Sequence, residues 1–205
     1  MQTVLADPGS KNTFFVSFIM AVRTQHEQET NSIYFVTFTC YQWLPLFHQT
    51  NSYDVVYKWF DYLYTQNIRV AGYVIMPNHV HVLLYFPEMK KSLNTVIVNG
   101  KRFIAYEIIK RLETERELLQ RLAASVKESE KKKGQLHKVF EDSFDAKKCM
   151  SKEFIYQKLD YIHHNPTSGK WMLANDFLSY AHSSALFYEE TVCIYDKLMR
   201  IEEVL

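Results

Sequence analysis

The chain has 205 residues, of which 47% are hydrophobic and only 5 are glycine and 5 proline, which is enough for one domain with a sizeable core. The formal net charge of +1 gives no sign of a generally basic, nucleic-acid-binding surface, although a local basic patch remains compatible with it. Cys40, Cys149 and Cys193 are odd in number and far apart. We therefore expect no disulfide framework, no Cys-x-x-Cys metal site and a cytoplasmic location.

The N-terminal segment, residues 1–31, is interpreted as an extension outside the main domain. Its apolar stretch, residues 14–22, is too short to span a bilayer. Only Lys11 precedes that stretch as a positive charge and no small-x-small cleavage site follows it, which argues against a signal peptide. We expect no membrane partner. The extension contains Met20, so residues 1–19 can be upstream sequence translated from an early start codon; the intact mass of the native gene product tests this.

The first half of the chain predicts three strands and one helix. Residues 32–41 are β-branched and aromatic with alternating threonines, which is typical of a strand. Asn51 and Ser52 can cap a helix that runs through Gln66. Residues 68–76 and 78–86 read as two further strands, joined by the turn signal Pro77-Asn78 into a hairpin. The last of these strands is apolar on both faces apart from its histidines, which indicates a central position.

The second half predicts a long helical region, a linker, a strand and a last helix. The helical region covers residues 92–130, with a break or bend expected at Gly100. A charged linker follows at residues 128–134, and a fourth strand is expected over 137–144. Ser151 caps the last major helix, and Pro166 ends it because a residue before proline is pushed out of the helical region.

The order β-α-β-β-α-β followed by a helix predicts an α+β, ferredoxin-like fold: an antiparallel sheet with the crossover helices on one face and an appended C-terminal helix. The first and third strands would be the central pair. The histidines would lie on the face that the crossover helices leave open, where the appended helix can cover them.

His79 and His81 share one face of the third strand, because alternate strand residues point the same way. A lone histidine on a strand is more often structural than a ligand. Two buried imidazoles need partners, and a metal ion is one such partner. Two nitrogens alone suit zinc; an added amide oxygen, with positions left for water and phosphate, favours Mg²⁺ or Mn²⁺.

Tyr161 and Asn165 share a face of the last helix, one turn apart. Taken alone, they are better explained as a core tyrosine and a capping asparagine. Beside the histidines they gain a chemical meaning: a metal held by His79, His81 and Asn165 could polarise a phosphodiester while the Tyr161 phenol attacks it. The neighbouring His163 and His164 could relay a proton, but surface or capping roles suit them better.

These residues resemble a known family. Pro77-Asn78-His79-Val80-His81, Tyr161-Ile162-His163-His164-Asn165-Pro166 and the tail His182-Ser183-Ser184, in this order, are similar to the motifs of single-tyrosine HUH transposases, in particular the REP-associated tyrosine transposases. The resemblance covers roughly residues 32–188. It leaves 189–205 as a C-terminal tail.

The resemblance implies a ferredoxin-like fold and DNA transposition by strand cleavage and rejoining. His79, His81 and Asn165 match the family's metal ligands, for Mg²⁺ or Mn²⁺, and Tyr161 matches the nucleophile. The family cuts single-stranded DNA beside a hairpin, leaving a 5′-phosphotyrosine and a free 3′-OH. Its members occur as monomers and as homodimers that exchange the tyrosine helix.

Basic residues concentrate between residues 101 and 148, interleaved with glutamates. Lys101, Arg102 and Lys110 are plausible phosphate contacts by charge alone. A solvated helix with i,i+4 ion pairs explains the same pattern at least as well.

Two other functions stay open. The chain can be a domesticated protein that binds structured single strands without turnover, although such a protein has no need of all four site residues. It can also be a nuclease of the plasmid relaxase or replication-initiator kind, although those usually have longer chains with added domains.

Overall fold

The computed structural model describes residues 30–169, 172–190, 192 and 194–205. The predicted N-terminal extension, apart from its last two residues, and the alternative start at Met20 lie outside the described residues, as does Cys193. Within the described part of the chain, no helix is long and apolar enough to cross a membrane.

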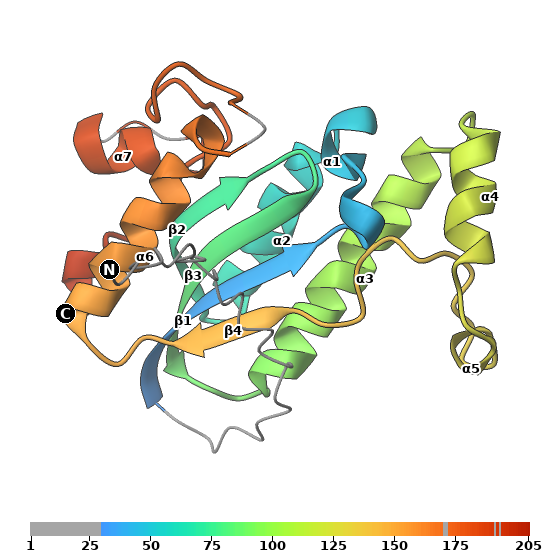
Figure 1. The fold of residues 1–205 in the computed structure, drawn as a ribbon. Coiled ribbons are helices and arrows are strands. Elements are labelled where there is room, and N and C mark those ends of the chain that lie inside the picture. The colour runs from blue at the N-terminus through green and yellow to red at the C-terminus, as the bar shows by residue number, and fades with distance from the viewer. Residues whose placement is uncertain (1–29, 170–171, 191, 193) are drawn as a thin grey trace, which may run out of the picture.

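Four antiparallel strands form one sheet: β1 (Thr30–Thr39), β2 (Arg69–Ile75), β3 (His79–Glu88) and β4 (Asp145–Lys148). Their order across the sheet is β2-β3-β1-β4, so β1 and β3 are the central pair, as predicted. Helix α2 (Tyr53–Thr65) lies between β1 and β2 in the chain, and α3 (Leu93–Arg111) follows β3 (Figure 1). This β-α-β-β-α-β order confirms the predicted ferredoxin-like, α+β class.

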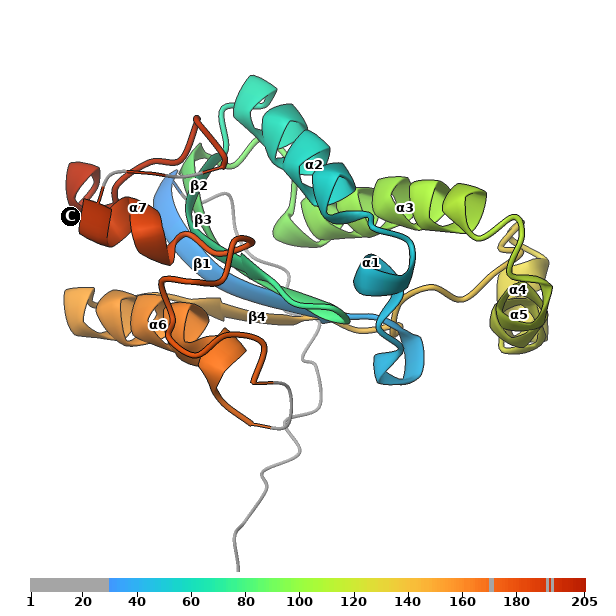
Figure 2. The ribbon, with the colours of Figure 1, turned by 90° about the horizontal axis from the view of Figure 1, so that it is seen from above.

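Different helices cover the two faces of the sheet: α2 and α3 lie on one face and α6 (Lys152–His164) on the other (Figure 2). Successive side chains of β3 point to opposite faces. Val80, Val82 and Leu84 belong to the larger apolar cluster, which α2 and α3 complete, whereas Leu83 belongs to the smaller cluster completed by α6. The appended helix therefore covers the face that the crossover helices leave open, as predicted.

Helix α3 runs unbroken through Gly100, so the predicted break at this residue is wrong. The glycine serves close packing instead. A Cβ atom at Gly100 would clash with Nε1 of the buried Trp59 on α2, so the absence of a side chain lets the two helices approach. Within the predicted helical region 92–130, the first interruption comes after Arg111, where α3 ends. Two further helices, α4 (Arg116–Ala124) and α5 (Glu128–Lys131), then project from one end of the domain (Figures 1 and 2). The start of the predicted linker 128–134 is thus helical.

The predicted fourth strand, residues 137–144, is wrong: β4 is Asp145–Lys148. Val139 and Phe140 are buried in the larger cluster, but this stretch pairs only through an isolated bridge between Cys40 and Phe140. The actual strand has the sequence Asp-Ala-Lys-Lys, without the branched and aromatic residues typical of strands. It lies at the edge of the sheet with β1 as its neighbour, where such residues are tolerated.

The C-terminal segment covers the outer edge of β2. The Ile75 amide donates to the His182 carbonyl (2.9 Å), and the Ser184 amide donates to the Tyr73 carbonyl (2.9 Å). Beyond α7 (Ala185–Glu190), the Met199 amide donates to the Val70 carbonyl (2.9 Å). Part of the predicted tail 189–205 therefore packs on the domain, and contributes the buried side chains Tyr195, Leu198, Met199 and Ile201.

The remaining short helices are η1 (Tyr41–Trp43) and α1 (Leu46–Gln49), which connect β1 to α2, with η2 (Asn165–Thr167) directly after α6 and η3 (Ile201–Glu203) near the C-terminus.

Candidate active site

His79 and His81 lie at the start of β3 on the face covered by α6. Their rings are close together, with centroids 4.6 Å apart, and the residues are only 6% and 5% exposed. The His81 ring stacks on Phe35 of β1 at 5.5 Å between centroids. The two imidazoles therefore form a compact pair set into an otherwise apolar surface.

Each histidine is held through its Nδ1 atom. Nδ1 of His79 lies 2.6 Å from Oδ1 of Asn78, and Nδ1 of His81 lies 2.6 Å from Oγ1 of Thr37. The Asn78 amide group donates in turn to the Trp43 carbonyl (3.2 Å), which leaves Oδ1 as the acceptor toward His79. In this tautomer Nε2 of His79 carries the lone pair, the arrangement found where histidines bind metals.

Both histidines are uncharged at neutral pH. Burial lowers the pKa of His79 to about 4, against the smaller opposing effect of the hydrogen bond that the ring can donate to Asn165. Burial also lowers the pKa of His81 well below its ordinary value, as do the neighbouring His79 and Lys158. Neutral imidazoles are ready ligands for a cation.

Asn165 reaches both histidines from the end of α6. Its amide nitrogen lies 3.4 Å from Nε2 of His81. The predicted effect of Pro166 on its predecessor is wrong: Asn165 keeps helical dihedral angles (φ −57°, ψ −41°). The turn is stabilised as the short helix η2, in which the Ser168 amide donates to the Asn165 carbonyl (3.3 Å) and Pro166 is buried. Asn165 consequently stays on the same helix face as Tyr161.

Tyr161 lies one turn earlier on α6, with its ring centroid 5.1 Å from that of His81 and 6.0 Å from that of Phe35. The residue is 48% exposed. Its phenol is thus accessible from solvent and adjacent to the histidine pair, as a nucleophile toward a bound substrate must be.

Two lysines flank the tyrosine. Lys158 lies one turn before Tyr161, with its ammonium 5.1 Å from the Phe35 ring centroid and 5.7 Å from that of Tyr161. Lys147 of β4 pairs with Phe35 in the sheet. Burial, and then the positive charge of Lys147, lowers the pKa of Lys158. The Lys158 ammonium therefore puts positive charge beside the phenol, and Lys147 adds to it from the neighbouring strand.

The donor set fits a divalent cation that prefers open coordination. Two imidazole Nε2 atoms and the Asn165 amide oxygen would supply three ligands, and leave further positions for water and phosphate oxygen. Within the described ranges, no group of three or more His, Cys, Asp or Glu side chains is arranged to hold a metal. The mixed imidazole–amide set is therefore the candidate metal site, on the chemistry of its donor atoms.

The other two helix histidines have structural contacts. Nε2 of His163 lies 2.9 Å from Oγ of Ser184, and that oxygen accepts from the Tyr73 amide (2.9 Å). His163 is buried and ties α6 to the C-terminal segment and β2. His164 is exposed and contacts Asp160, one turn earlier on the helix. Neither histidine has a recorded hydrogen bond or ring contact with Tyr161 among the described residues.

The fold has a counterpart among solved structures. One is the structure of a REP-associated tyrosine transposase bound to a REP hairpin, with a TM-score of 0.56 and 13% sequence identity over 87% of this chain and 92% of the other. No protein-family model matches the chain, and no curated protein matches it. The resemblance inferred from the sequence motifs is therefore confirmed at the level of the fold.

The predicted phosphate contacts lie elsewhere. Lys101, Arg102 and Lys110 are on α3, across the sheet from the histidines. The Lys101 ammonium donates to the Glu141 carbonyl (2.6 Å) and the Ser143 carbonyl (3.3 Å), and burial lowers its pKa to about 8. Arg102 and Lys110 are exposed. The structure does not bring these three residues together with Tyr161, and their contact with DNA stays a prediction.

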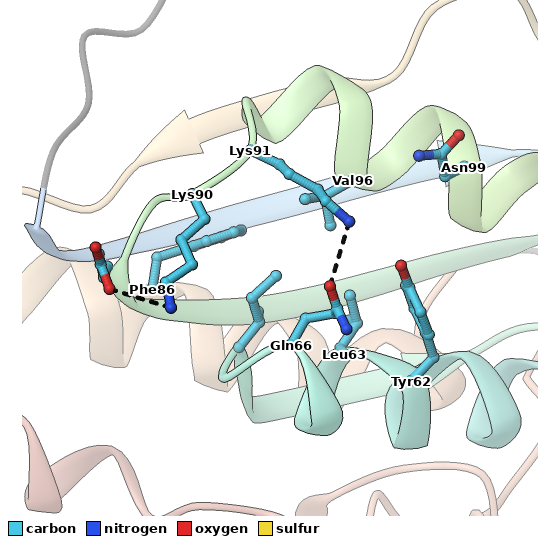
Figure 3. Close-up of a pocket in the computed structure, with 10 residues that line it drawn as sticks. Tyr62, Leu63, Gln66, Phe86, Lys90, Lys91, Val96 and Asn99 are labelled. Atoms are coloured by element: carbon cyan, nitrogen blue, oxygen red, sulfur yellow. Dashed lines mark hydrogen bonds and ion pairs between the residues drawn. The ribbon is translucent and has the colours of Figure 1, made fainter.

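The best-formed cavities are also remote from the histidines. One, of about 130 Å³, lies where α2, the end of β3 and the start of α3 meet; Lys91 donates to Gln66 at its rim (Figure 3). A second, shallower hollow of about 460 Å³ lies beside the stacked rings of Tyr53 and His182. Neither cavity is lined by a predicted site residue.

Sequence reasoning missed Thr37, Asn78 and Lys158. Asn78 precedes His79 directly, so its position was a usable signal. Thr37 is 44 residues away from His81 in the chain, and only the strand register brings the two together.

Proposed function

We propose that this chain is a metal-dependent DNA transposase, or transposase-derived endonuclease, that cleaves and rejoins single-stranded DNA through Tyr161. What carries the proposal is the convergence of an accessible phenol, two neutral imidazoles and one amide on a single face of the sheet. This set suits phosphodiester transesterification and has no evident purpose in packing, because apolar side chains would fill the same space at lower cost.

In the proposed reaction the Tyr161 oxygen attacks the scissile phosphorus. A bond forms between phosphorus and the phenol oxygen, and the bond to the 3′-oxygen breaks. The phenol proton is released to solvent and the 3′-oxygen takes up a proton as it leaves. The products are a 5′-phosphotyrosine and a free 3′-OH. Attack by a 3′-OH on the phosphotyrosine reverses the same changes and rejoins a strand.

His79, His81 and Asn165 are proposed to hold a Mg²⁺ or Mn²⁺ ion. When bound, such an ion neutralises phosphate charge and makes the phosphorus more electrophilic. Asn78 and Thr37 keep the two imidazoles oriented through their Nδ1 atoms. Lys158 and Lys147 are proposed to bind the phosphates of the strand near Tyr161.

The proposed substrate is single-stranded DNA that carries a hairpin. The solved transposase of similar fold is bound to a REP hairpin, and the motif resemblance points to the same class of substrate. We propose that a monomer holds all four site residues, without a homodimeric exchange of α6. We propose that the reaction takes place in the cytoplasm, on DNA from around its own gene.

The test is covalent adduct formation on a denaturing gel. Tiled single strands from both flanks of the gene are mixed with the protein in Mg²⁺, Mn²⁺ or chelator. We expect a slow-migrating protein–DNA adduct that requires metal. It should be absent with Tyr161→Phe and unchanged with Tyr156→Phe, a tyrosine on the same helix that bonds to Glu202.

An adduct that persists in Tyr161→Phe would contradict the assignment of the nucleophile. Salt-dependent binding of hairpin strands, without cleavage in any divalent metal, would instead indicate the non-catalytic, domesticated DNA-binding protein.

A further inference from the structure

Trp43 is an exposed tryptophan beside the candidate active site. It ends η1, in the connection between β1 and α1, and is 57% exposed, whereas Trp59 in the core is 2% exposed. Large aromatic side chains stabilise a fold mainly by burial. The Trp43 indole contributes little of this kind, so packing does not account for it.

The backbone at this point is unusual. Gln42 and Trp43 both have positive φ angles, 51° and 57°, a left-handed conformation that is costly for bulky residues. Such conformations persist only where the surroundings impose them, and they cluster at binding and catalytic sites.

Contacts with four other residues impose the conformation. The Gln42 amide donates to Oε1 of Glu141 (2.8 Å), and Arg121 of α4 donates to the Gln42 side chain. The Trp43 amide donates to the Cys40 carbonyl (3.0 Å), and the Trp43 carbonyl accepts from Asn78 (3.2 Å). These contacts fix the backbone that carries the indole.

That place is next to the histidines. The Trp43 ring lies 5.8 Å from the His79 ring, centroid to centroid, at an angle of 69°. The series of neighbouring rings continues through His81 to Tyr161, with centroid separations of 4.6 and 5.1 Å. A strand whose scissile phosphate meets Tyr161 above the histidines has its flanking bases within reach of the indole.

We propose that Trp43 stacks on a nucleobase next to the scissile phosphate and so sets the position of the strand relative to Tyr161; this inference rests on the proposed function. Base–aromatic stacking binds single strands with little dependence on base identity, because every base presents a π-face. Trp43 is thus a substrate-binding residue, and the contacts of Gln42 hold it in place.

The experiment is a cycle that combines a protein variant with a DNA variant. The probe is the gene-flanking strand that forms the adduct with wild-type protein, together with copies that carry one abasic site at successive positions around the cleaved bond. Affinity is measured by fluorescence anisotropy in chelator, so that binding is read without cleavage. The proteins are wild type, Trp43→Ala, Trp43→Leu, Trp43→Phe and Tyr106→Ala; Tyr106 is a 70% exposed aromatic on α3, across the sheet.

We expect Trp43→Ala and Trp43→Leu to bind the intact strand about 10-fold more weakly, whereas Trp43→Phe and Tyr106→Ala stay within about twofold of wild type. One abasic position next to the cleaved bond should weaken binding by wild type and leave Trp43→Ala unaffected. The chain has three tryptophans, Trp43, Trp59 and Trp171. Adding the strand should quench wild-type tryptophan fluorescence, and Trp43→Phe should lose most of this quenching.

Trp43→Ala that binds like wild type, with the same sensitivity to abasic sites and the same quenching in Trp43→Phe, would overturn the inference while leaving the proposed function intact. Wild type that binds no strand and forms no adduct would overturn both. Because the indole is exposed, the variants should retain the wild-type melting temperature, which is checked on each sample.

Discussion

The two faces of strand β3 carry different kinds of buried side chain. Toward α2 and α3 it presents Val80, Val82 and Leu84, all fully buried in the larger apolar cluster. Toward α6 the same strand presents His79 and His81, equally sheltered but each held by a polar partner. Apolar burial contributes about 1.5–3 kcal/mol per large side chain, whereas a buried polar group without a partner costs about 1–3 kcal/mol.

The contrast is the one expected if the proposed function, and not packing, determines the side chains on the α6 face. On the α2/α3 face the side chains are explained by the space that they fill. On the α6 face the imidazoles need Asn78 and Thr37 merely to be tolerated, and the chain gains no stability that leucine would not supply. Stability and activity should therefore respond separately to changes on the two faces.

The variants His81→Leu and Leu84→Ala should differ most in how they affect adduct formation and stability. His81→Leu should lower adduct formation by about 100-fold or more, because it removes a proposed metal ligand, while stability at pH 7 in chelator stays within about 1 kcal/mol. Leu84→Ala should lower the free energy of unfolding by about 2–5 kcal/mol, with the folded protein still forming adduct. Denaturant melts and adduct gels measure both. Equal losses of adduct formation in the two variants would contradict the claim that the two faces serve activity and stability separately.

A second pair of variants, at one glycine on each face, should also affect adduct formation and stability differently. A Cβ at Gly72 of β2 would lie 2.6 Å from Cδ1 of Leu159 on α6, and one at Gly100 would press on Trp59. Gly72→Ala should displace α6 and lower adduct formation about 10-fold, because small misplacements of reacting groups are costly. Gly100→Ala should lower stability by about 1–3 kcal/mol through overpacking and spare adduct formation. The reverse pattern would mean that α6 does not position the reacting groups.

The third prediction asks which face binds the strand. The salt dependence of single-strand affinity has a slope of about −0.7 per phosphate contact. Lys147→Gln combined with Lys158→Gln should flatten that log–log slope by about 1.4, because two contacts are lost. Arg102→Gln combined with Lys110→Gln, on α3, should leave it unchanged. A flatter slope only in the α3 variant would mean that DNA binds to the α2/α3 face, as the charge of the sequence alone suggested.

The last prediction concerns pH. Burial lowers the pKa values of His79 and His163 to about 4, below the ordinary value of 6.5. Between pH 6.5 and pH 4 the unfolded chain therefore binds more protons than the folded chain, so stability is full above pH 6.5 and declines toward pH 4. We expect a loss of about 1–2 kcal/mol per buried histidine between pH 7 and pH 5.

Denaturant melts in chelator at the two pH values measure this loss. His163→Gln should reduce it, and His48→Gln, at an exposed position, should not. A stability that is the same at pH 5 and pH 7 would mean that the histidines are not buried as described.

The order of elements and the facing of the site residues could be predicted from the sequence because both follow from local periodicity. Alternation along β3 put the histidines on one face, and four-residue spacing on α6 aligned Tyr161 with Asn165. The similarity to a solved transposase structure confirms the predicted fold. The chemical roles of these residues stay predictions.

What could not be predicted depends on tertiary context. Strand β4 carries Asp145 and Lys147 instead of β-formers, and pairing with β1 alone makes it a strand. The Lys101 ammonium donates hydrogen bonds to backbone carbonyls that only folding brings near it. Asn165 stays helical before Pro166 because the following turn holds it, against its local preference.

The most direct test of the account is the identity of the residue that carries the DNA. Adduct made by wild-type protein with its gene-flanking strand in Mn²⁺ is digested with nuclease and trypsin and mapped by mass spectrometry. The tryptic peptide of residues 159–170 contains Tyr161 as its one tyrosine. The account predicts a 5′-linked nucleotide on that peptide and on no other. A nucleotide on a different peptide would contradict it.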